Sequence, residues 1–181
     1  VSHMTGNASL IALSLADQDY SSVIFLVLVV ISYVLGSSYS GLILGNSHFQ
    51  LARRYGLPLT LVTIFILLCW LFISEYPRYA LLWACASMGI QNAMVSHYQG
   101  AIIRTTHLSG VLTDLGLALG YFFRGLKNDP KKIILHLLIL IGFITGSIVA
   151  AISYPYLQLN AFLIPAGLSF LLSLIYWILY L

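Results

Sequence analysis

The segment IIRTTHLSGVLTDLGLALG, residues Ile102 to Gly120, is the most informative stretch of this sequence. Its first half carries an arginine, a histidine and several hydroxyl groups, and an aspartate follows, although only 7% of the chain is charged and 60% is hydrophobic. Polar groups and irregular backbone at membrane depth survive only where protein or a water-filled cavity surrounds them. The segment therefore predicts a polar joint within an otherwise apolar protein.

The apolar segments around this joint are long enough to cross a bilayer, which takes about 20 residues per helix. They do not alternate in polarity as the strands of a membrane barrel do. We expect an all-α polytopic membrane protein with spans at Val23–Leu35 (with a Gly/Ser-rich tail ending near Gly45), Leu57–Ile73, Tyr79–Met94, Ile133–Ile152 and Ala161–Leu181. The net charge of +3 comes from connecting segments, so it does not argue for nucleic-acid binding.

Part of the joint segment recurs at the start of the chain. Aligning residues 1–16 with residues 105–120 gives identities at His3 and His107, Gly6 and Gly110, Leu13 and Leu117, and Leu15 and Leu119. Each copy precedes a helix with spaced small residues, namely Ser37, Gly41 and Gly45 in one and Gly142 and Gly146 in the other, with Gly36-Ser37 opposite Gly146-Ser147. Small residues at this spacing let helices approach closely in lipid. We expect two repeats, residues 1–75 and 79–181, the first lacking its first helix.

The basic residues predict how the two repeats are oriented. One basic loop holds Arg53 and Arg54, and the other holds Arg124, Lys127, Lys131 and Lys132. If both loops are cytoplasmic, as the positive-inside rule favours, the two small-residue helices run in opposite directions. The expected fold is then two inverted-topology repeats whose broken or half helices meet near the membrane midplane. Eight full spans in a parallel repeat is the alternative.

Broken helices of inverted-repeat transporters expose backbone amides and carbonyls to a solute or an ion. The candidate substrate or ion path is therefore formed by polar residues of the two joints and of the preceding span: His3, Thr5, Gly6, Asn7, Gln91, Asn92, Arg104, Thr105, Thr106, His107, Ser109, Gly110, Thr113 and Asp114. Thr106 or Ser109 is also expected to cap the helix that follows the second joint.

Asp114 is the acid that lies within an apolar helix. A carboxylate there costs roughly 2.5–3.5 kcal/mol on insertion scales, so it should face the interior and be paired. Arg104 and His107 share its helical face and are the expected partners. The pair would be either a structural polar clamp or a proton relay through His107. His136, beside a loop, is expected at the surface, and Pro165 is expected to kink the last helix.

The stretches VSHMTGN, GIQNAMVSHYQG and RTTHLSGVLTDLG resemble the YoaK-like bacterial inner-membrane family, a domain of unknown function. The resemblance covers essentially the whole chain and implies a multi-pass protein of the bacterial plasma membrane. Members usually begin with a further apolar helix, which corresponds to the missing first helix of repeat one. The motif positions of the family fall on the candidate path residues named above, except Ser109, and on Gly116. The resemblance brings no substrate.

Three functions are open from the sequence. The leading hypothesis is a small transporter or channel for a small polar or anionic solute, with proton coupling through His107 and Asp114. A non-catalytic subunit of a membrane complex, including a homo-oligomer, is the second. An integral-membrane enzyme is the third, and it is disfavoured because no HExxH, GxSxG or Cys/His cluster is present. No cofactor is expected, since two inward histidines without a CxxCH motif are poor evidence for haem.

Overall fold

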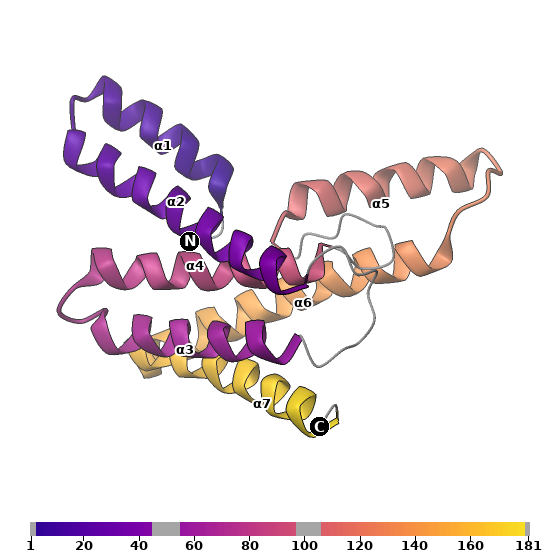
Figure 1. Ribbon diagram of the computed structural model, residues 1–181. Helices are drawn as coiled ribbons and strands as arrows, with labels where there is room; N and C mark the ends of the chain where they lie inside the picture. Colours follow the sequence, from indigo (N-terminus) through magenta and orange to yellow (C-terminus); the bar gives the residue numbers. More distant parts are fainter. Residues whose placement is uncertain (1–2, 45–54, 97–105, 180–181) are drawn as a thin grey trace.

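The computed structural model describes residues 3–44, 55–96 and 106–179, and Figure 1 shows their arrangement. The elements are α1 (Met4–Ala16), α2 (Tyr20–Leu44), α3 (Gly56–Phe72), α4 (Pro77–Val95), α5 (Leu108–Phe123), α6 (Pro130–Leu157), the short 3-10 helix η3 (Gln158–Phe162) and α7 (Leu163–Leu179). The described residues contain no strand, which confirms the all-α prediction.

The apolar segments of the sequence lie within these helices. Two helical runs, Tyr20–Leu44 and Pro130–Leu179, are long and apolar enough to cross a membrane, and α1, α3 and α5 are shorter apolar helices. The second run joins α6, η3 and α7, and the chain reverses inside it at Gln158, whose φ is 47°.

Two expectations near prolines need correction. The helix α6 continues through Pro155 to Leu157, beyond the end of the expected span at Ile152. Pro165 lies in the first turn of α7 and does not kink its middle. Its missing N–H costs little there, because the first-turn N–H groups of a helix have no partner within the helix.

Helices α2 and α4 pack with their backbones in contact. A Cβ added to Gly36 would collide with the Ala86 carbonyl oxygen, and one added to Gly89 would collide with the carbonyl oxygen of Tyr33. The Ser37 hydroxyl donates to the Gly89 carbonyl oxygen over 3.1 Å. The two glycines therefore face each other's helices, and this mutual contact fixes how α4 lies on α2.

Most of the glycines that were predicted to let two helices approach closely do not contact another helix. Gly41, Gly142 and Gly146 have nothing within 4 Å of an added Cβ, and Gly45 lies outside the described residues. The buried positions of α2 are Val29, Gly36, Ser40 and Leu44. They follow the helical period of 3.6 residues, and Gly41 is rotated about 100° away from this face.

Helices α3 and α7 are joined by hydroxyl groups. The Thr60 and Ser173 hydroxyl oxygens lie 2.7 Å apart, the Thr63 hydroxyl donates to that of Ser169 over 3.0 Å, and the Trp177 indole N–H donates to the Thr60 hydroxyl oxygen over 3.2 Å. The residue numbers rise on α3 as they fall on α7, so the helices are antiparallel. Such hydroxyl pairs hold helices together where the surroundings are apolar.

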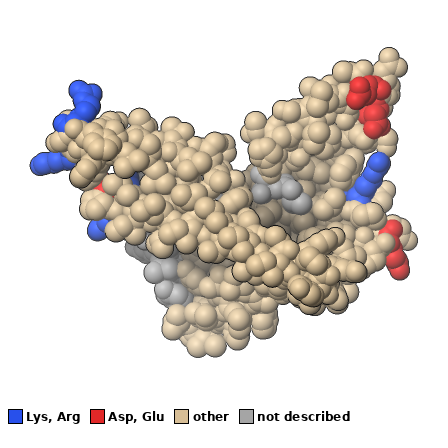
Figure 2. Space-filling model, turned by 180° about the vertical axis from the view of Figure 1, so that it is seen from behind, with Lys and Arg blue, Asp and Glu red and all other residues tan. Residues whose placement is uncertain are grey.

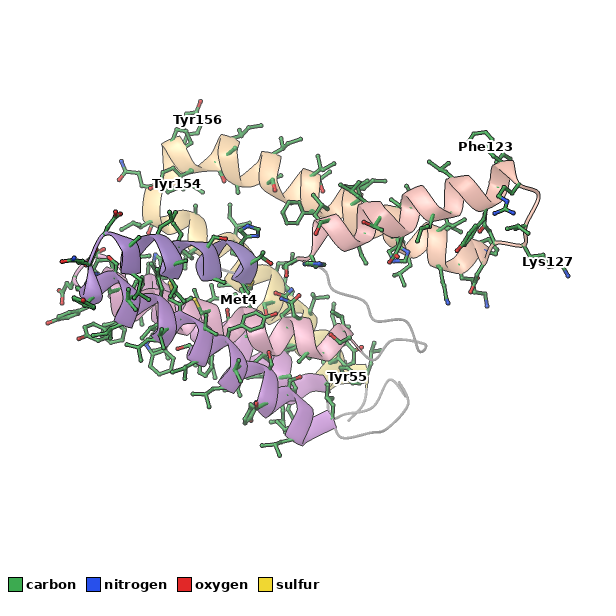
Figure 3. The ribbon with its side chains drawn as sticks, turned by 90° about the horizontal axis from the view of Figure 1, so that it is seen from above. Met4, Tyr55, Phe123, Lys127, Tyr154 and Tyr156 are labelled. Carbon is green, nitrogen blue, oxygen red and sulfur yellow. The ribbon has the colours of Figure 1, made fainter. Side chains whose placement is uncertain are left out.

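The hairpin of α5 and α6 extends away from the bundle formed by α2, α3, α4 and α7 (Figures 1 and 3). Its helices pack mainly on each other. Within α5 only Val111 is buried, and α6 has no buried residue along its 28 residues. Large apolar side chains are therefore exposed along the whole hairpin.

The α1–α2 and α5–α6 hairpins share a series of local features. A histidine precedes each first helix, and a glycine follows three residues later. Each first helix ends in the same hydrogen-bond pattern around a residue with positive φ, Gln18 at 58° and Gly125 at 67°. The carboxylate of Asp19 or Asp129 then caps the second helix through the backbone N–H of Ser22 or Lys131.

The likeness extends to helix lengths and directions. Helices α3 and α7 each have 17 residues with a proline as the third. Gly36 follows the capping Asp19 at the same distance in sequence as Gly146 follows Asp129. In Figure 1, α2 and α6 run in opposite directions, and so do α3 and α7.

Candidate functional site

Asn92 is the centre of a buried polar cluster where α2, α4 and the start of α5 meet. Its side-chain nitrogen donates to the Tyr33 hydroxyl oxygen over 3.0 Å and to the Thr106 hydroxyl oxygen over 2.8 Å. The Thr106 hydroxyl in turn donates to Oδ1 of the Asn92 side chain over 3.2 Å. Asn92 is 5% exposed. Because a buried amide without partners is costly, this cluster ties three segments together.

The sequence predicted Asn92 and Thr106 as site residues, and the structure brings them together. It adds Tyr33, which the sequence analysis missed. Tyr33 lies one turn before Ser37, on the face of α2 that contacts Gly89. A tyrosine aligned with small residues on one helical face is the signal that would have found it.

The expected cap of α5 is wrong. The residue before the helix is His107, and no side chain makes a capping hydrogen bond there. Thr106 is engaged by Asn92, and Ser109 is exposed inside the first turn. A hydroxyl that satisfies a buried amide is not available to the helix terminus.

Both histidines fold back over the glycine of their own helix. A Cβ added to Gly110 would lie 2.9 Å from His107 Cδ2, and one added to Gly6 would collide with the ring of His3. The backbone angles of the two histidines are similar, at φ −85° and ψ 73° for His3 and φ −101° and ψ 71° for His107. The glycine at this position therefore leaves room for the imidazole, and the two joints share one local structure.

Asp114 pairs with a residue that the sequence analysis placed at the surface. Its carboxylate oxygen Oδ2 lies 3.2 Å from Nε2 of His136, whose side chain is 13% exposed. The prediction of a His107 partner is wrong for a geometric reason: seven residues of helix separate the two by about 10 Å along the axis. Arg104, the other expected partner, lies outside the described residues.

The remaining predicted residues are more dispersed. Thr5, Gln91, Ser109 and Thr113 are exposed. Asn7 is half-buried, with its side-chain nitrogen 3.9 Å from the Met4 sulfur. Thr105 lies outside the described residues. Among the described residues, no three His, Cys, Asp or Glu side chains are placed to hold a metal ion.

The model of one protein family, described as a protein of unknown function (DUF1275), matches residues 1–175. The chain belongs to the DUF1275 family. No curated protein and no solved structure matches it.

Among the described residues of this DUF1275 chain, the charged side chains other than Asp114 gather at two ends. Figure 2 shows lysine and arginine at the tip of the α5–α6 hairpin and mainly acidic residues at the opposite end, with uncharged surface between them. The basic tip carries Arg124, Lys127, Lys131 and Lys132, whereas the opposite end carries Asp17, Asp19, Glu75 and Arg78.

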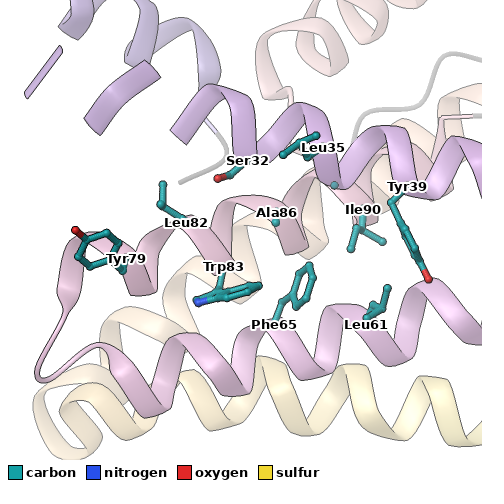
Figure 4. A pocket seen from close by; sticks show the side chains of 11 residues that line it. Ser32, Leu35, Tyr39, Leu61, Phe65, Tyr79, Leu82, Trp83, Ala86 and Ile90 are labelled. Atoms are coloured by element: carbon teal, nitrogen blue, oxygen red, sulfur yellow. The ribbon is translucent and has the colours of Figure 1, made fainter. Parts of the chain in front are cut away.

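Two cavities formed by the described residues differ in character. An apolar groove of about 710 Å³ lies between α2, α3 and α4 and is lined by aromatic rings that include Tyr39, Phe65 and Trp83 (Figure 4). A polar cavity of about 510 Å³ lies between α5 and α6, and Asp114 and His136 line it. The second cavity brings a titratable pair and charged loop residues to one place.

Proposed function

We propose that this DUF1275 chain is a multi-pass membrane protein that moves a small polar or anionic solute across the bilayer. The proposal includes an inverted repeat, with residues 1–75 and 79–181 as its halves. The resemblance to bacterial inner-membrane proteins favours the bacterial plasma membrane as its location.

The distribution of apolar and charged groups supports a membrane location. Exposed leucine, isoleucine, valine and phenylalanine side chains cover the outside of α2, α6 and α7. Apart from Asp114, the charged residues of the described chain lie at two opposite ends, and the basic tip would face the cytoplasm under the positive-inside rule. The α2 helix is 25 residues long, or about 37 Å, which is sufficient for the hydrocarbon core.

The paired local features of the two halves support the inverted repeat. The His–Gly joints, the positive-φ helix ends and the aspartate caps recur in the same order in both hairpins. The paired helices run in opposite directions in Figure 1. Figure 3 places Met4, at the start of α1, toward the middle of the molecule, whereas Phe123 and Lys127 lie at the far tip of the other hairpin.

The observation that carries the transport proposal is the Asn92 cluster. It sets an amide and two hydroxyl groups together at the place where Thr106, just before α5, contacts α4. Amides and hydroxyls both donate and accept hydrogen bonds, so they replace the water of a small polar solute without introducing a charge. The N–H groups of the first turn of α5, which no side chain caps, add donors that favour an anionic group.

Reconstitution in proteoliposomes tests this proposal. A panel of small carboxylates, inorganic anions, polyols and amino acids should include at least one solute whose uptake requires the protein. Asn92→Leu, similar in size but unable to hydrogen-bond, should reduce that uptake at least tenfold. Leu42→Ala, at an outward position of α2 that is 85% exposed, serves as the matched control and should retain it. No uptake of any panel solute, or full uptake by Asn92→Leu, would reject the proposal.

The exposed α6 helix favours a second candidate, a subunit of a membrane complex or a homo-oligomer. None of its residues is buried, and Gly142 and Gly146 have open space around them. Glycines four residues apart suit close contact with another helix. The mass of the protein in nanodiscs decides between the candidates, because an obligate assembly would not be recovered as a single chain.

A further inference from the structure

The Asp114–His136 pair differs from an ordinary surface ion pair because both ring nitrogens of the histidine have acceptors beside them. Nδ1 lies 2.7 Å from the Lys132 carbonyl oxygen. Nε2 lies 3.2 Å from the Asp114 carboxylate oxygen. A carbonyl oxygen only accepts hydrogen bonds, so Nδ1 carries a hydrogen. The backbone of α6 thereby fixes the tautomer of the ring.

The fixed tautomer determines how many protons the pair must hold. With Nδ1 protonated, a neutral ring presents only a lone pair at Nε2, and an ionised carboxylate also only accepts. One further proton is needed to make a hydrogen bond between them. It resides either on Nε2, giving imidazolium and carboxylate, or on the carboxyl, giving neutral imidazole and acid. Both forms have zero net charge.

We propose that Asp114 and His136 form a binding site for a single proton that holds α5 against α6. When the proton leaves for water in the cavity, two acceptors face each other and the pair has a net charge of −1. The contact then opens. This role rests on the proposed transport: the proton is the coupling ion, and its site lies away from His107.

The surroundings suit a proton that enters and leaves. The Asp114 side chain is 55% exposed and borders the polar cavity of about 510 Å³. The other titratable groups lining this cavity are Lys127, Asp129 and Lys132, together with Tyr121. The two lysines bring positive charge to the same cavity, so departure of the proton does not leave an isolated charge. Asp129 is held at the start of α6 by the Lys131 N–H, 3.0 Å away.

Movement of α5 would transmit the state of the pair to the Asn92 cluster. The helix starts two residues after Thr106, which is hydrogen-bonded to Asn92. About 12 Å of helix axis separates Thr106 from Asp114 at 1.5 Å per residue. A helix this short moves as a rigid body, so opening at Asp114 tilts the segment that carries the Thr106 hydroxyl.

Spin labels at Leu119 on α5 and Leu138 on α6, which are 60% and 62% exposed, report this opening in the full chain. Cys69 and Cys85 are replaced by alanine, and pulsed electron paramagnetic resonance in nanodiscs gives the distance distribution from pH 5 to pH 9. The native pair should shift to longer distances as the pH rises. Asp114→Asn should abolish the shift and stay short, because its amide donates to Nε2 without an added proton. His136→Ala should give long distances throughout.

A native distribution that does not change with pH, or an equal shift in Asp114→Asn, overturns the proton site. Proteoliposomes separate this result from the transport proposal. Asp114→Asn should lose the acceleration of uptake by an inward proton gradient. If the spin labels respond but no solute is taken up, the transport proposal fails and the proton site stands. If uptake occurs and Asp114→Asn still follows the gradient, the proton site fails and transport stands.

Discussion

Gly89→Ala tests the contact on which the bundle depends. The added methyl group would collide with the Tyr33 carbonyl oxygen and lie 3.1 Å from the Ser37 backbone nitrogen. Carbon and oxygen normally stay about 3.3–3.6 Å apart even in favourable C–H···O contacts. Because the obstacle is backbone, no rotamer change relieves it, and α2 and α4 must separate.

The expected loss follows from three effects. Overpacking of this kind costs about 1–3 kcal/mol. Separation also weakens the hydrogen bond from Ser37 to the Gly89 carbonyl. An interhelical hydrogen bond in a membrane protein contributes about 0.6 kcal/mol of stability on average. Alanine favours the helix over glycine by about 1 kcal/mol and partly offsets both. The net destabilisation is about 0.6–2.6 kcal/mol.

The two cysteines of the chain can report its thermal unfolding. Cys69 and Cys85 are 0% and 1% exposed, so a thiol-reactive dye labels them only as the bundle opens on heating. Gly41→Ala is the matched control, because the same substitution in a helix there meets nothing within 4 Å. It should be neutral or stabilising by up to about 1 kcal/mol. Equal melting temperatures for the two variants would refute the close approach of α2 and α4.

Three further predictions concern polar contacts. The losses of unfolding free energy caused by Thr63→Val and Ser169→Ala should not add in the double variant, and the difference should be about 0.6 kcal/mol and at most about 1.7 kcal/mol. Strictly additive losses would contradict a hydrogen bond between the two hydroxyl groups. Asn92→Leu should lower stability by about 1–3 kcal/mol by leaving hydroxyl partners unpaired, and an unchanged melting temperature would contradict the buried cluster. The hydroxyl and backbone N–H of Ser22 lower the pKa of Asp19. The stabilisation by this cap is complete above the ordinary carboxyl pKa and is lost as the pH falls through the lowered value. Melts from pH 7 to pH 2 should therefore show Asp19→Ala and the native chain converging in acid, and a constant difference would oppose this assignment.

The helices were predictable because their signal is local. The runs of apolar residues predicted the bounds of α2, α3, α4 and α7 to within a few residues. The packing faces were harder to predict, since a glycine has the same spacing signal whether it faces a helix or open space. Gly36 and Gly89 are close to backbone, whereas Gly41 and Gly146 are not. The two cases differ only in whether the glycine lies on the most apolar face of its helix. In a helix that is apolar on every side, that face is hard to identify from the sequence.

The pairing of Asp114 shows where reasoning from one helix fails and what replaces it. His107 and Asp114 share a helical face, but about 10 Å of axial rise between them exceeds the reach of a direct contact. The partner, His136, comes instead from the next helix, which runs the other way. In an antiparallel hairpin, paired residues lie at equal distances on either side of the turn, and Gly125, with φ 67°, lies midway between residues 114 and 136. Glycine in a polar connection between two apolar helices marks such a turn in the sequence alone. The same symmetry explains why the pair has a lysine-rich connection beside it: the residues that let the chain reverse also surround the proton that we place between α5 and α6.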